Sequence, residues 1–301
     1  MNRLRRSELA TPASNLKMIA KAAASDADLV FLDLEDAVAP AEKVQARENA
    51  IAALHDLDWG RTTRAVRVNA VGTDWAHDDI AALVSRAGDV LDVIILPKVL
   101  SARDVWFVET MLDVLEARHQ IATPIALEVL IEEAEALRRV DEIAAASKRL
   151  EALIIGQGDL AASLGVRFGH VADPATAYPG DVWHFARSQV TAAAKAAGLD
   201  AVDGPFPDFT DVDGYRREAT WTSTLGMTGK WAIHPSQVGI ANEVFAPTET
   251  ELALAQQMCD AYTAAQARGD GSAGSSGLLV DAASVRLFQA VLDRHHQITG
   301  A

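Results

Sequence analysis

Cysteine is almost missing from this chain of 301 residues, which contains only Cys259. A single cysteine excludes an internal disulfide framework and is typical of a protein in a reducing cytoplasm, which is the compartment that we predict. Long apolar runs are missing as well, because no stretch approaches the roughly 20 residues that a membrane-spanning helix needs. The early basic residues Arg3, Arg5 and Arg6 precede no signal-like apolar segment, so we predict neither membrane insertion nor export.

Basic residues are also scarce. The chain has 27 lysine and arginine residues against 42 aspartate and glutamate residues, which gives a formal net charge of −15. Proteins that bind nucleic acid carry a basic surface patch, so this composition argues against a nucleic-acid partner. Half of the residues are apolar, and a chain of this length can bury a sizeable core as one large domain, or as one domain with a small appendage.

Short apolar runs of the strand type alternate with longer helical patterns as far as residue 245. This alternation is typical of repeated βα units around a parallel sheet. Eight such runs favour a closed barrel over an open sheet, so we predict an α/β fold, a (β/α)₈ TIM barrel that occupies residues 1–246. The predicted strands cover residues 8–10, 29–34, 65–69, 93–96, 125–131, 153–156, 199–202 and 230–233, and the predicted helices include 41–54, 102–118, 133–146, 181–197 and 215–225.

The pattern changes beyond the barrel, where residues 247–301 predict a C-terminal helical extension. A long helix over 248–268 is followed by the Gly/Ser-rich stretch 269–277 and by a last helix over 282–295. The Gly/Ser-rich composition predicts a flexible linker, which would let the last helix contact a neighbouring subunit. An earlier irregular stretch, 167–180, is predicted to form an active-site loop.

Polar side chains follow the predicted strands at the end where a barrel of this type holds its chemistry. In chain order they are Glu35, Asp36, Arg67, Asn69, Lys98, Glu132, Asp159, Asp203 and His234. Glu132 and Asp159 follow consecutive strands, and Mg²⁺ typically takes one or two protein carboxylates and leaves its other positions to water and substrate. We therefore predict a metal-dependent enzyme in which these two carboxylates hold Mg²⁺, although oxygen ligands also suit Mn²⁺. Gly156 and Gly158 would allow close backbone approach at this site.

These positions also have structural interpretations. A carboxylate at the start of a helix is favoured by the helix dipole, and this alone would account for Glu132 or Asp159. Arg67 lies on the same side of its strand as Asn69. It provides a fixed cation for a substrate carboxylate or for developing negative charge, or it forms an ion pair with a rim carboxylate. His234 is a candidate base, and a packing role explains it equally well.

Seven segments carry a family resemblance over nearly the whole chain. They are LEDAVAP at 34–40, VRVN at 66–69, ILPKV at 95–99, LIE at 130–132, GDLAAS at 158–163, DGPF at 203–206 and GKWAIHPSQ at 229–237. In combination they resemble the HpcH/HpaI aldolase and citrate lyase β-subunit superfamily, and within it the malyl-CoA/β-methylmalyl-CoA lyase branch. The resemblance implies a Mg²⁺-dependent barrel that cleaves, and can form, the C–C bond between an acyl-CoA and a 2-oxo acid.

The resemblance also assigns residues and substrates. It places the metal ligands on Glu132 and Asp159, the essential arginine on Arg67, and a C-terminal acid on Asp281, which in relatives closes over a neighbouring subunit's site. The expected assembly is a homotrimer or a homohexamer. The expected substrate is L-malyl-CoA or a close relative such as β-methylmalyl-CoA or citramalyl-CoA, which gives acetyl-CoA or propionyl-CoA plus glyoxylate or pyruvate. An ordinary helix N-cap is the structural interpretation of Asp281.

The predicted roles follow from the cost of breaking this bond. The 2-hydroxyl loses a proton and the two-carbon fragment leaves as a thioester enolate, so a cation at Arg67 would stabilise oxyanion charge. Asp281 would exchange the proton at the acetyl carbon. The predicted substrate-binding residues are Arg67, Glu132, Gly158, Asp159, Glu35 and Asp36.

The first strand departs from the family pattern. It continues as LATPASN over residues 9–15, where relatives have an aromatic residue, then Pro-Gly-Ser and often a basic residue that help to hold CoA. Lys21 stands at a matching position and is the predicted contact to the CoA phosphates. Two alternatives therefore stay open: a malyl-CoA thioesterase on the same fold, and a citrate-lyase-β-like subunit that needs an acyl-carrier partner.

Overall fold

Eight parallel strands close into a barrel in the computed structural model, which describes residues 3–167, 180–275 and 277–300. Each strand pairs with the next, and the last pairs with the first, which confirms the predicted (β/α)₈ TIM barrel. Most of the predicted active-site loop, residues 168–179, lies outside the described residues. The strands are β1 (Ser7–Pro12), β2 (Leu29–Asp33), β3 (Thr63–Arg67), β4 (Val93–Leu96), β5 (Ala126–Ile131), β6 (Leu150–Ile155), β7 (Asp200–Asp203) and β8 (Gly229–Ala232).

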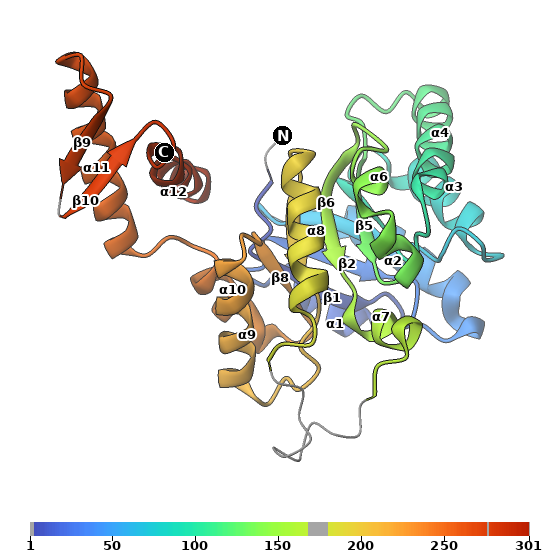
Figure 1. The fold of residues 1–301 in the computed structure, drawn as a ribbon. Helices are drawn as coiled ribbons and strands as arrows, with labels where there is room; N and C mark the ends of the chain where they lie inside the picture. The colour runs from blue at the N-terminus through green and yellow to red at the C-terminus, as the bar shows by residue number, and fades with distance from the viewer. Residues whose placement is uncertain (1–2, 168–179, 276, 301) are drawn as a thin grey trace. The chain divides into compact units, whose positions relative to one another are not determined.

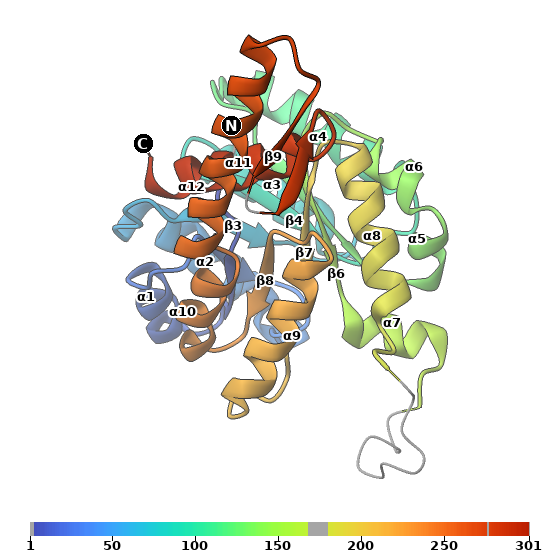
Figure 2. The ribbon, with the colours of Figure 1, turned by 60° about the vertical axis from the view of Figure 1, so that its left-hand side comes forward.

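Helices lie outside the strands of the barrel (Figure 1). The view of Figure 2 shows α8 and α9 running along the outside beside β7 and β8. The helices are α1 (Leu16–Ala23), α2 (Lys43–Asp56) after the 3₁₀ turn η1 (Pro40–Glu42), α3 (Ala76–Ala87), α4 (Ala102–His119), α5 (Ala134–Arg138), α6 (Val140–Ala144), α7 (Gln157–Leu164), α8 (His184–Ala196), α9 (Val212–Thr224) and α10 (Pro235–Val244). A capping box between Ser101 and Asp104 begins α4.

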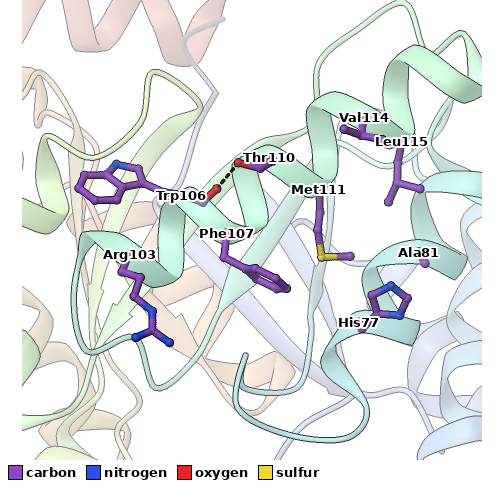
Figure 3. A pocket seen from close by; sticks show the side chains of 9 residues that line it. All are labelled: His77, Ala81, Arg103, Trp106, Phe107, Thr110, Met111, Val114 and Leu115. Carbon is purple, nitrogen blue, oxygen red and sulfur yellow. Dashed lines mark hydrogen bonds between the residues drawn. The ribbon is translucent and has the colours of Figure 1, made fainter.

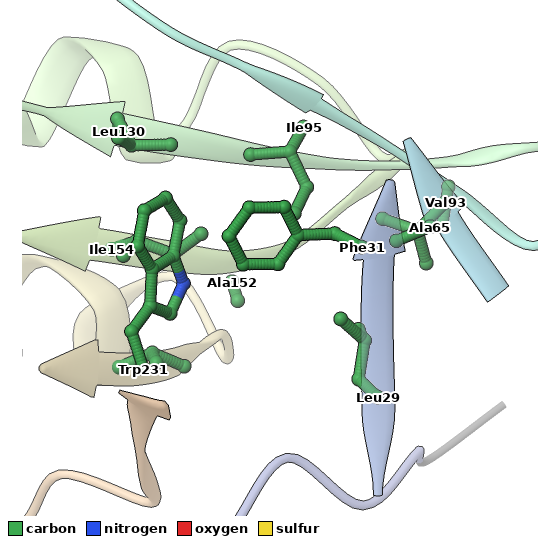
Figure 4. Packing of buried hydrophobic residues seen from close by; sticks show 11 residues of the cluster. Leu29, Phe31, Ala65, Val93, Ile95, Leu130, Ala152, Ile154 and Trp231 are labelled. Atoms are coloured by element: carbon green, nitrogen blue, oxygen red, sulfur yellow. The ribbon is translucent and has the colours of Figure 1, made fainter. Parts of the chain in front are cut away.

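The core of the barrel is apolar because its parallel strands are covered on the outer face by helices and filled on the inner face by side chains. All five residues of β2 are buried. Inside the barrel, the rings of Phe31 and Trp231 lie 4.4 Å apart between their centres, among aliphatic side chains such as Ile95, Leu130 and Ile154 (Figure 4). This packed interior supports the polar residues at the carboxyl ends of the strands.

Several predicted boundaries differ from the structure by a few residues, and two of the differences have a clear physical cause. The single helix predicted over 133–146 is two short helices, because the backbone of Arg139 leaves the helical region between α5 and α6. Strand β6 begins at Leu150, three residues before its predicted start. The sequence analysis missed this part of the strand because the charged Glu151 interrupts the apolar pattern. In the structure the carboxylate of Glu151 pairs with the buried guanidinium of Arg5.

The chain divides into two compact units, one of Arg5–Asn242 and one of Met1–Leu4 with Glu243–Ala301. The second unit holds α11 (Glu249–Ala267) and α12 (Val285–Thr299), which contact each other. Among the described residues, no helix is both long and apolar enough to cross a membrane.

The predicted flexible linker is wrong. Within the Gly/Ser-rich stretch, β9 (Ser272–Ser275) pairs antiparallel with β10 (Leu278–Asp281). Small residues of β9 stand opposite larger ones of β10, as Gly274 does opposite Leu279, and α11 contacts both strands. Val280 is fully buried. Burial of this side chain and backbone pairing order a segment whose composition alone predicts flexibility.

Candidate active site at the carboxyl ends of the strands

Arg67 is held by two carboxylates at the end of β3. Asp33 of β2 is its register partner, so both side chains lie on the same face of the sheet. The Arg67 Nε donates to Asp33 Oδ1 at 2.7 Å and the Nη2 donates to Oδ2 at 2.6 Å. The Nη1 lies 3.2 Å from Glu35 Oε2. The ion pair that the sequence offered as the structural interpretation of Arg67 is therefore present.

Asp33 is a residue of this site that the sequence analysis missed. It is 2 % exposed, and its two oxygens also accept hydrogen bonds from the backbone N–H groups of Glu35 (2.9 Å) and Ala37 (3.1 Å). The bidentate pair fixes the plane of the guanidinium. Although burial acts to lower it, the pKa of Arg67 is raised above its ordinary value by hydrogen bonds and charge from Asp33 and by the charge of Glu35. The available signal was the position of Asp33 two residues after Phe31, on the inward face of β2.

The ion pairs leave part of the Arg67 guanidinium for a ligand. An arginine has five N–H donors, and the contacts to Asp33 and Glu35 account for three of them. Two N–H groups of Arg67 therefore have no hydrogen-bond partner among the described residues. The site can therefore use Arg67 both as a partner of carboxylates and as a donor to substrate.

Glu132 stands immediately after β5 and is only 3 % exposed. Its Oε1 accepts a hydrogen bond of 2.7 Å from the backbone N–H of Lys98. Burial raises the pKa of Glu132 to about 8, with the negative charges of Asp159 and Glu35 adding to the shift and the Lys98 N–H and the Arg67 charge opposing it. Two carboxylates and Arg67 are therefore near enough to Glu132 to change its ionisation.

Gly156, directly after β6, leaves the space that the side chain of Glu132 occupies. A β-carbon at Gly156 would fall 2.6 Å from the β-carbon and 2.7 Å from Oε2 of Glu132. This confirms the close backbone approach predicted for that glycine. Gly158 is exposed, and a β-carbon there would meet nothing within 4 Å, so the described residues do not crowd it. Asp159 follows on the first turn of α7 and is half-buried.

Lys98 is the second cation of the site. Its Nζ contacts the carboxylate of Glu35 and lies 3.0 Å from Asp36 Oδ1. The backbone φ of Lys98 is +51°, a left-handed conformation that is uncommon for any residue with a side chain. This conformation presents the backbone N–H to Glu132 while the side chain reaches the other two acids. Strained backbone of this kind clusters at functional sites.

The acids around Lys98 have different proton affinities. Burial raises the pKa of Glu35, against the opposing charge of Arg67 and the hydrogen bond from Lys98. At Asp36 burial also acts upward, but the hydrogen bond and charge of Lys98 prevail and lower its pKa. Asp36 is exposed and Glu35 is 5 % exposed. The pair therefore offers one carboxylate that stays ionised and one that holds a proton more readily.

The balance of charge in this cluster suits a divalent cation. Five acids (Asp33, Glu35, Asp36, Glu132 and Asp159) meet three basic side chains, because the buried Nζ of Lys43 joins Arg67 and Lys98 by donating to the backbone carbonyl of Glu35 at 2.9 Å. Full ionisation would therefore leave two negative charges in excess. A buried carboxylate is stabilised by a cation nearby. Within the described ranges no three acidic, histidine or cysteine side chains are arranged to hold a metal ion unaided. A site with two carboxylates, Glu132 and Asp159, leaves the remaining positions to water and substrate.

Two other residues at strand ends have structural roles. Asp203 is fully buried and pairs with Lys230 at 2.5 Å and with the Nε of Arg187 at 2.9 Å. His234 is exposed, and its Nδ1 lies 2.8 Å from Ser236 Oγ. The contacts of Asp203 tie β7, β8 and α8 together, whereas the contact of His234 is local to the start of α10.

Asp281 and Lys21 are not brought into this cluster by the described contacts. Asp281 belongs to the C-terminal unit, where its Oδ1 accepts hydrogen bonds from the backbone of Ala283 (3.0 Å) and Ser284 (2.8 Å). The hydrogen bonds from Ser284 lower the pKa of Asp281. A cap-like turn before α12 is therefore present, as the structural interpretation expected. Lys21 is exposed in the last turn of α1.

A pocket of about 580 Å³ lies between α3 and α4 on the outside of the barrel (Figure 3). Trp106, Phe107 and Met111 of α4 line it, with His77 of α3 on the opposite side. None of the predicted site residues lines it, so this pocket is separate from the polar cluster at the strand ends.

Comparison with known proteins gives concordant matches. A family model described as HpcH/HpaI aldolase/citrate lyase matches residues 6–235. An L-malyl-CoA/beta-methylmalyl-CoA lyase from Cereibacter sphaeroides is 42 % identical over 303 aligned positions, which cover 98 % of this chain and 95 % of that protein. A (3S)-malyl-CoA thioesterase from the same species is 38 % identical over 92 % of this chain and 89 % of that protein.

Solved structures agree with this result. The crystal structure of CitE from Mycobacterium tuberculosis in complex with magnesium, acetoacetate and coenzyme A has a TM-score of 0.77 and 32 % sequence identity. The match covers 98 % of this chain and 99 % of that one.

Proposed function

Because the chain belongs to the HpcH/HpaI aldolase/citrate lyase family, we propose that it is a Mg²⁺-dependent lyase that acts on L-malyl-CoA or a close relative. The family resemblance predicted from the seven sequence motifs is confirmed. The reaction breaks a C–C bond of the substrate and leaves its thioester bond intact. The products are acetyl-CoA or propionyl-CoA and glyoxylate or pyruvate, and the reaction runs in both directions. The observation that supports the proposal is that Arg67 ends β3, Glu132 follows β5, and Asp159 lies in the first turn of the helix after β6, all at the carboxyl ends of strands of one closed barrel.

Glu132 and Asp159 are the proposed ligands of the metal. When bound, Mg²⁺ supplies Lewis-acid polarisation of the substrate hydroxyl and carboxylate oxygens. Gly156 keeps the space in which Glu132 lies, and the Lys98 N–H fixes one of its oxygens. The other oxygen of Glu132 thus remains for the metal. The CitE structure, which contains magnesium, supports the choice of metal.

Arg67 is the proposed stabiliser of negative charge. Cleavage moves the electron pair of the C–C bond into the thioester carbonyl, which becomes an enolate. The two N–H groups of Arg67 that Asp33 and Glu35 do not use can donate to this oxygen or to the carboxylate of the 2-oxo acid. Glu35 and Asp36, which meet at Lys98, are the proposed boundary of the substrate site, together with Gly158.

Asp281 is the proposed acid–base residue at the acetyl carbon. It returns a proton to the enolate in cleavage and removes one in condensation. We further propose that residues 247–301 form an extension that supplies Asp281 to a neighbouring subunit of a homotrimer or homohexamer. The hydrogen bonds from Ser284 lower the pKa of Asp281 and so favour the ionised carboxylate that acts as the base in the condensation direction.

The CoA moiety is the remaining part of the substrate. Lys21, exposed at the end of α1, is the proposed contact to its phosphates.

The low cysteine content and the absence of a spanning helix among the described residues fit the proposed cytoplasmic location.

Product analysis tests this function. Purified protein is incubated with Mg²⁺ and (S)-malyl-CoA, with and without EDTA, and acetyl-CoA, glyoxylate, free CoA and malate are resolved by mass spectrometry. Formation of acetyl-CoA and glyoxylate that EDTA abolishes is the expected result. Free CoA and malate would instead identify a thioesterase, the activity named for the relative that is 38 % identical. If neither pair forms, citramalyl-CoA, β-methylmalyl-CoA and carrier-bound thioesters are the next substrates.

A further inference from the structure

An aromatic platform lies under the guanidinium of Arg67. The guanidinium carbon is 5.5 Å from the ring centre of Trp231 and 5.9 Å from that of Phe31. The two rings pack against each other at 4.4 Å with a tilt of 41° (Figure 4). A cation over a desolvated aromatic face is attracted by the ring. Asp33 and Glu35 thus hold Arg67 through its N–H groups, while the platform limits its movement toward the barrel interior.

Trp231 is itself anchored by a buried carboxyl group. Its Nε1–H donates a hydrogen bond of 2.8 Å to Glu8 Oε2. Glu8 and Trp231 are register partners in the pairing of β1 with β8, and Glu8 is 0 % exposed. The platform is therefore tied to the neighbouring strand by a polar contact as well as by packing.

Glu8 is a costly residue to bury. Its Oε1 has no hydrogen-bond partner among the described residues, so the indole of Trp231 is the hydrogen bond that its carboxyl group makes there. A buried polar group without a hydrogen-bond partner destabilises the fold. Nothing in the chemistry proposed above uses Glu8 directly. Its contact to Trp231 points to a role that runs through that ring.

We propose that Trp231, held by Glu8, is a positioning residue for Arg67. This inference rests on the proposed function, because Arg67 acts on the enolate oxygen there. The indole keeps the guanidinium at the height where its two remaining N–H groups face the substrate. Smaller or unanchored side chains at this position leave space below Arg67, and the loss appears in the chemical step more than in substrate binding.

The test compares two buried tryptophans. Trp59 is 6 % exposed and donates its indole N–H to Ala53 O at 3.1 Å, so Trp59→Phe is a matched control. Trp231→Phe is expected to lower kcat for malyl-CoA about tenfold, with KM changed less than about threefold, whereas Trp59→Phe keeps the kcat of the wild type. Equal kcat values for the two variants would overturn the proposal.

A second pair of variants separates the anchor from general packing. Glu8→Met removes the acceptor at nearly constant volume, and Glu8→Gln keeps an oxygen that can accept from the indole. The proposal requires Glu8→Met to lose about as much kcat as Trp231→Phe and Glu8→Gln to regain most of it. Equal kcat values for Glu8→Met and Glu8→Gln would refute the anchor. Free energies of unfolding, measured for all variants, show that the compared proteins are folded.

One readout does not depend on the reaction. In protein labelled with ¹⁵N-arginine, and with Arg67→Lys to assign the signal, hydrogen exchange of the Arg67 Nε–H is expected to be about tenfold faster in Trp231→Phe and unchanged in Trp59→Phe. Exchange unchanged in Trp231→Phe would refute the positioning role. If the wild type cleaves no malyl-CoA, the proposed function fails, and this exchange measurement decides the positioning role by itself.

Discussion

The carboxylate of Glu132 lies directly against the backbone of Gly156, so that a β-carbon on the glycine would stand 2.6 Å from the β-carbon of Glu132. Real side chains do not approach this closely, and the contact joins the ends of β5 and β6. The φ of Gly156 is −101°, which any residue can adopt. The glycine is therefore needed for space and not for its backbone freedom.

A first prediction follows for metal binding. Gly156→Ala is expected to displace Glu132 and to raise the Kd for Mg²⁺ about 10- to 100-fold, the range seen when the support of a ligand is removed. Gly158→Ala is the matched control, because nothing lies within 4 Å of its added methyl group. Calorimetric titration of both variants with MgCl₂ gives the comparison. Equal Mg²⁺ affinities of the two variants would show that Glu132 is not a ligand, or that the backbone at the end of β6 shifts enough to accommodate the added methyl group.

Replacement of Arg67 by lysine tests the bidentate pair. Lysine keeps the charge but cannot satisfy both oxygens of Asp33 and still donate to substrate, so Arg67→Lys is expected to lower kcat about 10²- to 10³-fold. Arg47 provides the control, because it forms a comparable buried pair with Asp79 at 2.8 Å. Arg47→Lys should cost stability and leave kcat unchanged. A similar kcat for both variants in steady-state assays would contradict the role of Arg67.

Glu8 makes the stability of the protein depend on pH. Burial, followed by the charge of Glu128, raises its pKa well above the ordinary value of a glutamate, against the charge of Arg5 and the hydrogen bond from Trp231. The folded protein then binds more protons than the unfolded chain between the two pKa values, so Glu8 contributes a fall in stability as pH rises through that window. Glutamine has no proton to lose, which removes this contribution.

Glu8→Gln is therefore expected to increase the free energy of unfolding at pH 8 by about 1–3 kcal/mol, and the gain should shrink as pH falls toward the pKa of an unfolded glutamate. Glu48→Gln is the control, because the side chain of Glu48 is 43 % exposed and pairs with Arg86 at 2.7 Å. Urea unfolding at several pH values measures both. A gain from Glu8→Gln that is largest at low pH would reverse the sign and contradict this explanation.

Mixed oligomers test whether two subunits share one site. Arg67→Ala and Asp281→Ala are each expected to be nearly inactive alone. If Asp281 serves a neighbouring subunit, oligomers reassembled from both variants contain some sites with both native residues, and part of the wild-type activity returns. Oligomers of verified mixed composition that recover no activity would show that each site takes Asp281 from its own chain or does not use it. Full activity of Asp281→Ala alone would show that Asp281 has only a structural role, through its hydrogen bonds with Ala283 and Ser284.

Much of the barrel was predictable because its signal is local. Buried parallel strands are short apolar runs, and the side chains directly after them mark one end of the barrel. Glu132, Arg67 and Glu35 were found in this way, and the structure gathers them. The same local reasoning gave a wrong prediction for the Gly/Ser-rich stretch, which was expected to be a flexible linker. Its composition does not reveal the hairpin, because the hairpin depends on the burial of Val280 and on contact with α11.

The amino-acid sequence by itself determined the eight strands, their order and the acids and bases at their ends, because alternation and strand length depend on neighbouring residues. Only the tertiary structure decided which of these groups touch. The bond from Arg67 to Asp33, the backbone N–H of Lys98 on Glu132 and the ring of Trp231 under Arg67 each join residues 34 or more positions apart. Such contacts depend on strand register and side-chain direction, which follow from closure of the whole barrel.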